Sequence, residues 1–360
     1  MSILPSSATA VASHPRAATR LSPARVMARR LGLRYVQQDE LIWRRTRRGK
    51  GFCYLNANGE PIRDRRTVRR LASLAVPPAY EDVRYASDPA AHLQAVGRDA
   101  AGRLQYRYHL DWQKVREIRK ARRLVRLAEA LPKIRRSIAA YLASDEPTRE
   151  FAFAAVIELI ARTAVRPGND SYTRLHRTHG ATTLLKSHVI VEDDTLTLSY
   201  RAKGNKLVHK EVNAARLAAA ITLLRQLPGR RLFQYRDEVG AVRSVTSAQV
   251  NSFLREIAGV KISLKDFRTL LASAAVMELL ARTTPAASAR QRRKQVLEAV
   301  RATAEELANT PAICRKSYVH ETIVVAFEDG MLERFAAKMK GRSQVKREEL
   351  LAQVIATLAR

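Results

Sequence analysis

One tyrosine near the end of the chain, Tyr318, is a candidate nucleophile for a phosphate. It closes the segment 307–318, which also carries the amide side chain of Asn309. Three basic residues far upstream, Arg166, Lys203 and Arg268, lie in segments that could complete a phosphate site. If these side chains converge, the tyrosine can form a covalent tyrosyl phosphodiester and later release it.

Breaking a phosphodiester without metal or water requires a nucleophile, cations around the phosphate and an acid for the leaving oxygen. A free tyrosine has a pKa of about 10 and attacks poorly at neutral pH. Nearby guanidinium groups favour both the phenolate and the negative pentacoordinate state, and their planar fork binds two phosphate oxygens at once. Each residue alone is weak evidence, because the chain has 11 tyrosines and 65 Lys and Arg residues.

The charge of the chain points to nucleic acid. The 65 Lys and Arg residues against 34 Asp and Glu leave a net charge of +31, which a polyanion would neutralise. The basic residues are spread over the whole chain, and no apolar run of about 18 residues predicts a membrane span. Cys53 and Cys314 are too few for a disulfide framework or a zinc site. No Gly-rich phosphate loop or carboxylate cluster for Mg²⁺ is evident, so we expect no metal and no cofactor.

The pattern of apolar residues predicts an α+β protein with two domains after a tail. Residues 1–33 are rich in Ala, Ser, Pro and Arg and are expected to form a disordered basic tail. Residues 34–112 read as short strands separated by turns, a small and mostly β amino-terminal domain. From Trp112 the apolar spacing becomes helical, so residues 113–360 are expected to form a larger, mainly α catalytic domain.

Within the second domain, helical spacing predicts helices at residues 150–165, 214–227, 247–258, 268–282, 289–307 and 347–358. Strands at residues 189–192, 195–200 and 206–212, joined by tight turns, predict a small inserted β-sheet.

Ordered motifs in both halves resemble those of one known family. Segments 166–172 and 180–184 look like the first catalytic-arginine motif of type IB DNA topoisomerases of the poxviral and bacterial kind. Segment 200–206 resembles their hairpin lysine motif, segment 265–269 their second arginine motif, and Asn309 and Tyr318 their Asn-or-His and nucleophile pair. Segments 49–52, 74–80 and 102–109 match in the amino-terminal half. The fold implied is that of type IB topoisomerases and tyrosine recombinases.

The resemblance implies a role for each matching residue. Tyr318 would attack DNA and become joined to a 3′ phosphate, while Arg166, Arg268 and Asn309 bind the non-bridging oxygens. Lys203 would protonate the departing 5′ oxygen, and Lys265 would support the phosphate as a cation or second acid. Two candidates for the acid stay open here, Lys203 and Lys206. Ala202 stands where the family usually has Gly before the hairpin lysine, and Lys206 is close enough to compete for the acid role.

A strand in the amino-terminal domain is expected to bind DNA. Gln105, Tyr106 and Tyr108 alternate there with Arg103 and Arg107, which suits arginines on phosphates and polar groups on base edges. The alternative is that the tyrosines pack under the sheet and the arginines are solvated.

The implied activity is ATP-independent relaxation of duplex DNA by nicking one strand, rotation and religation. We expect a monomer that binds DNA and no membrane, in the cytoplasm and associated with the nucleoid. A tyrosine recombinase is the nearest alternative, although it typically has His where Lys265 stands. A non-catalytic basic DNA-binding protein is the other alternative, because the charge alone would suffice.

Overall fold

The computed structural model describes residues 22–49, 51–339 and 343–358. The chain divides into two compact units, one up to Arg119 and one from Lys120 onward. The first is built around a β-sheet and the second is mainly helical with small sheets, so the predicted α+β class is confirmed.

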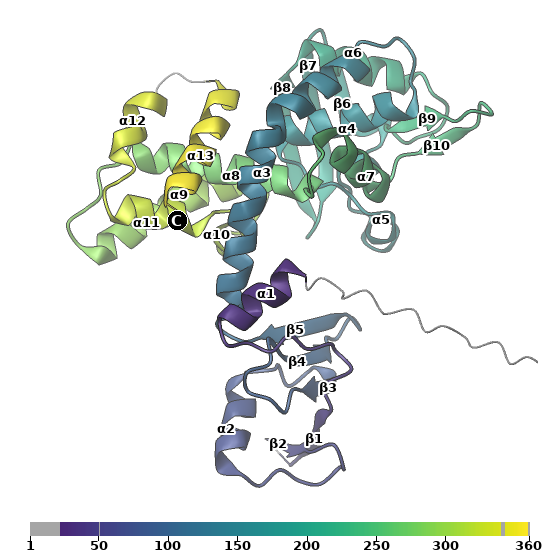
Figure 1. Cartoon of the computed structure of the whole chain (residues 1–360). Helices are drawn as coiled ribbons and strands as arrows, with labels where there is room; N and C mark the ends of the chain where they lie inside the picture. Colours follow the sequence, from purple (N-terminus) through teal and green to yellow (C-terminus); the bar gives the residue numbers. More distant parts are fainter. Residues whose placement is uncertain (1–21, 50, 340–342, 359–360) are drawn as a thin grey trace, which may run out of the picture. The chain divides into compact units, whose positions relative to one another are not determined.

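The first unit contains one antiparallel sheet with strand order β2-β1-β3-β4-β5 (Figure 1). Its strands are β1 (Trp43–Arg48), β2 (Gly51–Leu55), β3 (Glu81–Tyr85), β4 (Leu93–Arg98) and β5 (Leu104–Tyr108). Helix α2 (Arg65–Ser73) places Leu71 in a buried cluster with Tyr54, Tyr85 and Ala95 on one face of the sheet. Val96, one residue after Ala95, belongs to a separate buried cluster, as the alternation of side chains along a strand requires.

Part of the expected disordered tail is helical. Residues 1–21 lie outside the described residues, but helix α1 (Pro23–Arg30) follows directly. Ser22 caps it by accepting a hydrogen bond from the backbone of Arg25, and proline stands in its first turn. Met27 and Ala28 are buried in a cluster with Trp112, so apolar packing orders this segment against the expectation of disorder through residue 33.

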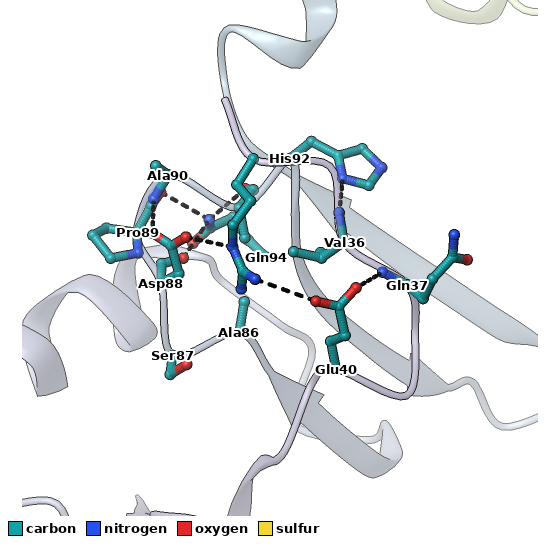
Figure 2. Close-up of polar contacts among 12 residues, drawn as sticks. Val36, Gln37, Glu40, Ala86, Ser87, Asp88, Pro89, Ala90, His92 and Gln94 are labelled. Atoms are coloured by element: carbon teal, nitrogen blue, oxygen red, sulfur yellow. Dashed lines mark hydrogen bonds and ion pairs between the residues drawn. The ribbon is translucent and has the colours of Figure 1, made fainter. Parts of the chain in front are cut away.

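A network of polar contacts ties the loop before β1 to the loop before β4 (Figure 2). Arg34 donates from Nε to Asp88 at 2.7 Å and from Nη1 to Glu40 at 3.2 Å. The backbone N–H of Val36 donates to His92 Nδ1 at 3.2 Å. Because His92 is buried, its desolvation lowers the pKa of the imidazole. Together with an isolated β-bridge between Arg34 and Ala91, this network holds the two loops together.

Helix α3 (Trp112–Tyr141) leads from the first unit into the second. The second unit then contains helices α4 (Arg149–Thr163), α5 (Asp170–His176), α6 (Ala215–Arg225), α7 (Ser247–Ala258), α8 (Leu264–Ala281), α9 (Ala289–Glu306), α10 (Pro311–Ser317), α11 (Glu321–Glu328), α12 (Glu333–Met339) and α13 (Gln344–Leu358). Its strands are β6 (Val189–Glu192), β7 (Thr195–Ala202) and β8 (Lys206–Asn213) in one antiparallel sheet and β9 (Gln234–Arg236) and β10 (Val242–Ser244) in another. Within the described residues, no helix has both the length and the apolar composition that a membrane crossing requires.

The core of this unit contains two helices that are buried on nearly all sides. Most residues of α4 are buried, and α8 contacts α4, α9 and α13. The predicted helices and the inserted sheet are confirmed, with shifts of a few residues at most ends. The sequence prediction missed α2 and the short helices α5, α10, α11 and α12, which are too short to show a clear apolar period.

Candidate active site

Tyr318 is placed by local helix signals at the end of α10. The side-chain oxygen of Thr310 accepts a hydrogen bond from the backbone of Ile313 at 3.3 Å, which starts the helix. At the other end, the backbone N–H of Tyr318 donates to the carbonyl of Cys314 at 2.9 Å. The tyrosine is 8% exposed, so its phenol is largely shielded from bulk water.

A serine on α8 holds the backbone around this tyrosine. Ser273 Oγ donates to the carbonyl of Tyr318 at 2.9 Å and accepts from the backbone N–H of His320 at 3.2 Å. Sequence reasoning missed Ser273. Its signal is a polar residue inside an apolar helix, which does not by itself identify a partner.

Arg268 is one turn into α8 and is 2% exposed. Its guanidinium donates to the carbonyl of Ala164, at the end of α4, and to the carbonyl of Leu307 at 3.2 Å, at the end of α9. Helix C-termini carry unpaired carbonyls and partial negative charge, so both contacts suit a cation. The guanidinium carbon lies 5.0 Å from the centroid of the Tyr318 ring, and Nε has no hydrogen-bond partner among the described residues.

The turn that ends α9 places Asn309 beside Arg166. The backbone N–H of Asn309 donates to Ala304 at 2.8 Å and that of Ala308 donates to Glu305 at 3.0 Å, the pattern of a Schellman motif. Asn309 Oδ1 then accepts from Arg166 Nη2 at 2.6 Å. Within the described part of the chain, Asn309 Nδ2 is buried without a hydrogen-bond partner, so one donor is free for a ligand.

Two backbone hydrogen bonds fix the loop that follows Arg166. The carbonyl of Arg166 accepts from the backbone of Ala181 at 2.7 Å, and that of Pro167 accepts from Thr182 at 2.8 Å. The two segments approach so closely that a Cβ on Gly180 would lie 2.6 Å from the carbonyl oxygen of Arg166. This explains why the motif at residues 180–184 accompanies the arginine although it supplies no charge.

The charges around Tyr318 favour its phenolate. Burial alone would raise the pKa of Tyr318, but the charge and hydrogen bonding of Arg268, with further contributions from Arg166 and Lys265, outweigh burial and lower this pKa below 10.0. The Lys265 ammonium lies 6.0 Å from the ring centroid. Burial, and secondarily the charge of Arg268, lowers the pKa of Arg166. Two guanidinium groups that repel each other in a shielded site would both gain from a bound anion.

A second buried tyrosine responds differently to the same arginines. Tyr200 on β7 is 4% exposed, and its desolvation raises its pKa to about 12, although the charges of Arg268 and Arg166 act in the opposite direction. Tyr318 is therefore the one of this pair whose environment activates it.

Lys203 lies outside this cluster of side chains. It is exposed on the turn between β7 and β8, where Gly204 and Asn205 have φ of 77° and 59°. Its ammonium lies 5.3 Å from the centroid of the Tyr172 ring. The structure thus brings Arg166, Lys265, Arg268, Asn309 and Tyr318 together and places Lys203 against a different ring.

The predicted DNA-binding strand is β5 in the first unit. Tyr106 and Tyr108 are 43% and 39% exposed, and their rings stack with centroids 6.1 Å apart. Arg103 and Gln105 both donate to the carboxylate of Asp99. Arg107 donates to the carbonyl of Ala75 at 2.9 Å. Both tyrosines are thus partly exposed, although the Tyr108 ring also stacks on Trp112 with centroids 6.2 Å apart. The side chains of Arg103, Gln105 and Arg107, which alternate with them along the strand, are held by local contacts.

No group of three or more His, Cys, Asp or Glu side chains placed to hold a metal ion is found within the described ranges. The candidate site consists of a phenol, two guanidiniums, an amide and an ammonium. These groups suit a bound phosphate and attack by the phenol.

Comparison with known proteins gives matches in both units. The family model for the catalytic core of eukaryotic DNA topoisomerase I matches residues 109–346. The model for the N-terminal domain of bacterial DNA topoisomerase IB matches residues 51–99. The chain is also 28% identical over 287 residues to DNA topoisomerase 1B of Acanthamoeba polyphaga mimivirus, covering 78% of this chain and 85% of that protein.

Proposed function

The chain belongs to the type IB DNA topoisomerases, and from that premise we propose that it relaxes duplex DNA through a covalent bond between Tyr318 and a 3′ phosphate. One strand is nicked, the duplex beyond the nick rotates, and the 5′ hydroxyl attacks the phosphotyrosine to reseal the strand. One phosphodiester is exchanged for another in each step, so neither step requires ATP.

Tyr318 is the nucleophile in this proposal. Its lowered pKa raises the fraction of phenolate, the attacking form, near neutral pH. The phenolate oxygen forms the new bond to phosphorus while the bond from phosphorus to the 5′ oxygen breaks.

Arg166, Arg268 and Asn309 bind the non-bridging oxygens of the phosphate. The proposal is supported by two donors of this site, Arg268 Nε and Asn309 Nδ2, which are buried and lack partners among the described residues. Burial of the cluster strengthens each interaction with the extra negative charge of the pentacoordinate state. Lys265 adds a supporting positive charge beside the phenol.

Lys203 donates the proton to the departing 5′ oxygen. Because its ammonium lies over Tyr172 in the free protein, Lys203 must leave this ring to reach the phosphate when DNA binds. An exposed hairpin with a glycine in its turn can make that movement at low cost. Lys206 lies at the base of the same turn, opposite Ala202, and is the competing candidate.

The remaining assignments concern DNA binding, the oligomeric state and the localisation of the protein. Tyr106, Tyr108 and Gln105 contact base edges, while Arg103 and Arg107 contact phosphates, so affinity should fall steeply with salt. The protein acts as a monomer on DNA, in the cytoplasm and associated with the nucleoid.

The convergence of Arg166, Arg268 and Asn309 on Tyr318 carries this proposal. The test is to mix the protein with supercoiled plasmid in EDTA without nucleotide, and to stop part of the reaction with SDS. We expect relaxed plasmid and protein covalently attached to the 3′ end of a nicked strand. Tyr318→Phe should give neither product. Relaxation by that variant at the wild-type rate would eliminate the nucleophile, and exchange of strands between two defined sites would indicate a recombinase.

A further inference from the structure

Two alanines at the ends of helices in the active site have a backbone conformation that favours glycine. Ala164, at the end of α4, has φ of 53°, and Ala308, at the end of α9, has φ of 48°. In this left-handed region the Cβ of an L-residue approaches the following carbonyl oxygen, so glycine is the usual residue there. Neither residue is distinguished by its side chain, which is a single methyl group.

Both alanines turn a helix end toward a catalytic arginine. The carbonyl of Ala164 accepts from Arg268, and Arg166 follows two residues later. The conformation of Ala164 thus sets one acceptor for Arg268 and the direction in which the chain leaves toward Arg166. Its own backbone N–H donates to Ile160 at 2.9 Å, the single bond of the simple left-handed helix ending.

The turn around Ala308 contacts both arginines. The carbonyl before it, of Leu307, accepts from Arg268 at 3.2 Å, and its own carbonyl is 3.5 Å from Arg166 Nη2. The residue after it is Asn309, whose amide accepts from Arg166. A change in the φ and ψ of Ala308 would therefore move acceptors of both guanidiniums together.

We infer that Ala164 and Ala308 are positioning residues. They restrict the backbone at the ends of α4 and α9, so that the catalytic guanidiniums are oriented for the phosphate before DNA binds. Glycine would adopt the same turn with less strain, but it also reaches many other φ and ψ values. Compared with glycine, alanine at these positions lowers the folding stability, but it keeps the acceptor carbonyls within a narrower range of orientations. Cations that are already oriented toward the phosphate stabilise the transition state without any reorganisation of the site during the reaction. This inference rests on the proposed function.

The test measures single-turnover cleavage of a duplex by saturating enzyme, together with thermal unfolding. Ala308→Gly should raise the unfolding midpoint and slow cleavage by on the order of 10-fold. Its cleavage should also reach a plateau at higher pH, because less fixed guanidiniums stabilise the Tyr318 phenolate less. Ala164→Gly should slow cleavage similarly, but without a rise in midpoint, because it removes a buried methyl group.

Two further variants separate positioning from a general effect of backbone strain. Ala308→Asn should cleave at about the wild-type rate, because asparagine tolerates the left-handed conformation and its Cβ still limits the backbone. Asp193→Gly relieves the same conformation, φ of 50°, in the turn between β6 and β7, and should leave the rate unchanged.

Wild-type cleavage and an unchanged pH profile in Ala308→Gly would overturn the inference, as would an equal loss in Ala308→Asn. Failure of the wild-type protein to form a covalent adduct would instead refute the proposed function, so the two failures are distinguishable.

Discussion

The helix-end cluster of Arg166, Arg268, Asn309 and Tyr318 and the β7–β8 hairpin that carries Lys203 are built in opposite ways. The cluster is largely shielded, and its arginines bind backbone carbonyls or the Asn309 amide. Lys203 is exposed on a turn, and its neighbour is the ring of Tyr172. One region is assembled in the free protein and the other is not.

This difference follows from the chemistry of the two cations. A guanidinium is weakly hydrated and has several donors in a fixed fork, so helix-end carbonyls can hold it in place without DNA. An ammonium is strongly hydrated on a flexible stem, and burying it early would be costly. We therefore expect the free protein to contain the groups that stabilise charge, and DNA binding to bring in the proton donor.

The largest predicted effect concerns the preassembled region. Arg268→Ala and Arg166→Ala should each slow single-turnover cleavage by about 10²–10³-fold, because each removes a fixed cation from the transition state. Arg268→Lys should restore little, because an ammonium cannot donate to Ala164 and Leu307 in the same geometry. Arg255→Ala, which removes an exposed arginine from α7, is the control for loss of charge. Equal rates for Arg268→Ala and this control would refute the preassembled site.

The next effect concerns the hairpin. Lys203→Ala should slow cleavage by about 10²-fold, the usual contribution of a general acid, and Lys206→Ala should have little effect. A substrate with sulfur in place of the 5′ bridging oxygen distinguishes the two regions, because a thiolate leaves without a proton. This substrate should restore the rate of Lys203→Ala but not that of Arg268→Ala. The reverse result for Lys203 and Lys206 would assign the acid role to Lys206.

The elements were largely predictable from the sequence, because apolar periodicity is a local property. The helix expected at residues 247–258 matches α7, and the strands expected at 189–192, 195–200 and 206–212 match β6 to β8 within two residues. Helix α1 was missed because its burial depends on Trp112, which is distant in sequence. Helix α10 was missed because a short helix has no measurable apolar period.

The site was predictable only in part. Motifs in their family order identified Tyr318, Arg268 and the other candidates, but no spacing indicates that residues so far apart converge. Arg268 is held by the backbone carbonyls of Ala164 and Leu307, which leave no trace in residue types, whereas Arg166 is held by the side chain of Asn309. The left-handed conformation of Ala164 and Ala308 was equally hidden, because glycine and asparagine are the residues that signal it.

A smaller effect should separate the two tyrosines that lie near the same arginines. Because the pKa of Tyr318 is lowered, cleavage should rise with pH and level off below pH 10.0. Arg268→Ala should shift this plateau to higher pH. The variant loses the positive charge that lowers the pKa of Tyr318, whereas the burial that raises this pKa remains. In the free protein, the ultraviolet absorbance of phenolate should appear below pH 10 for Tyr318 and only towards pH 12 for Tyr200. Titrations of Tyr318→Phe and Tyr200→Phe assign the two steps, and a loss of the early step in Tyr200→Phe would reverse the assignment.

The smallest predicted effect lies at the contact that keeps Lys203 away from the cluster. An exposed cation–π contact contributes about 0.5–1 kcal/mol, so Tyr172→Leu should speed cleavage by about 2–5-fold by releasing the ammonium. Tyr172→Phe keeps the ring and should behave as wild type. With the sulfur-containing substrate, Tyr172→Leu should give no gain, because no proton donor is required. A gain that persists with this substrate would mean that Tyr172 restrains the helix-end cluster, and the division between a preassembled and a recruited region would then fail.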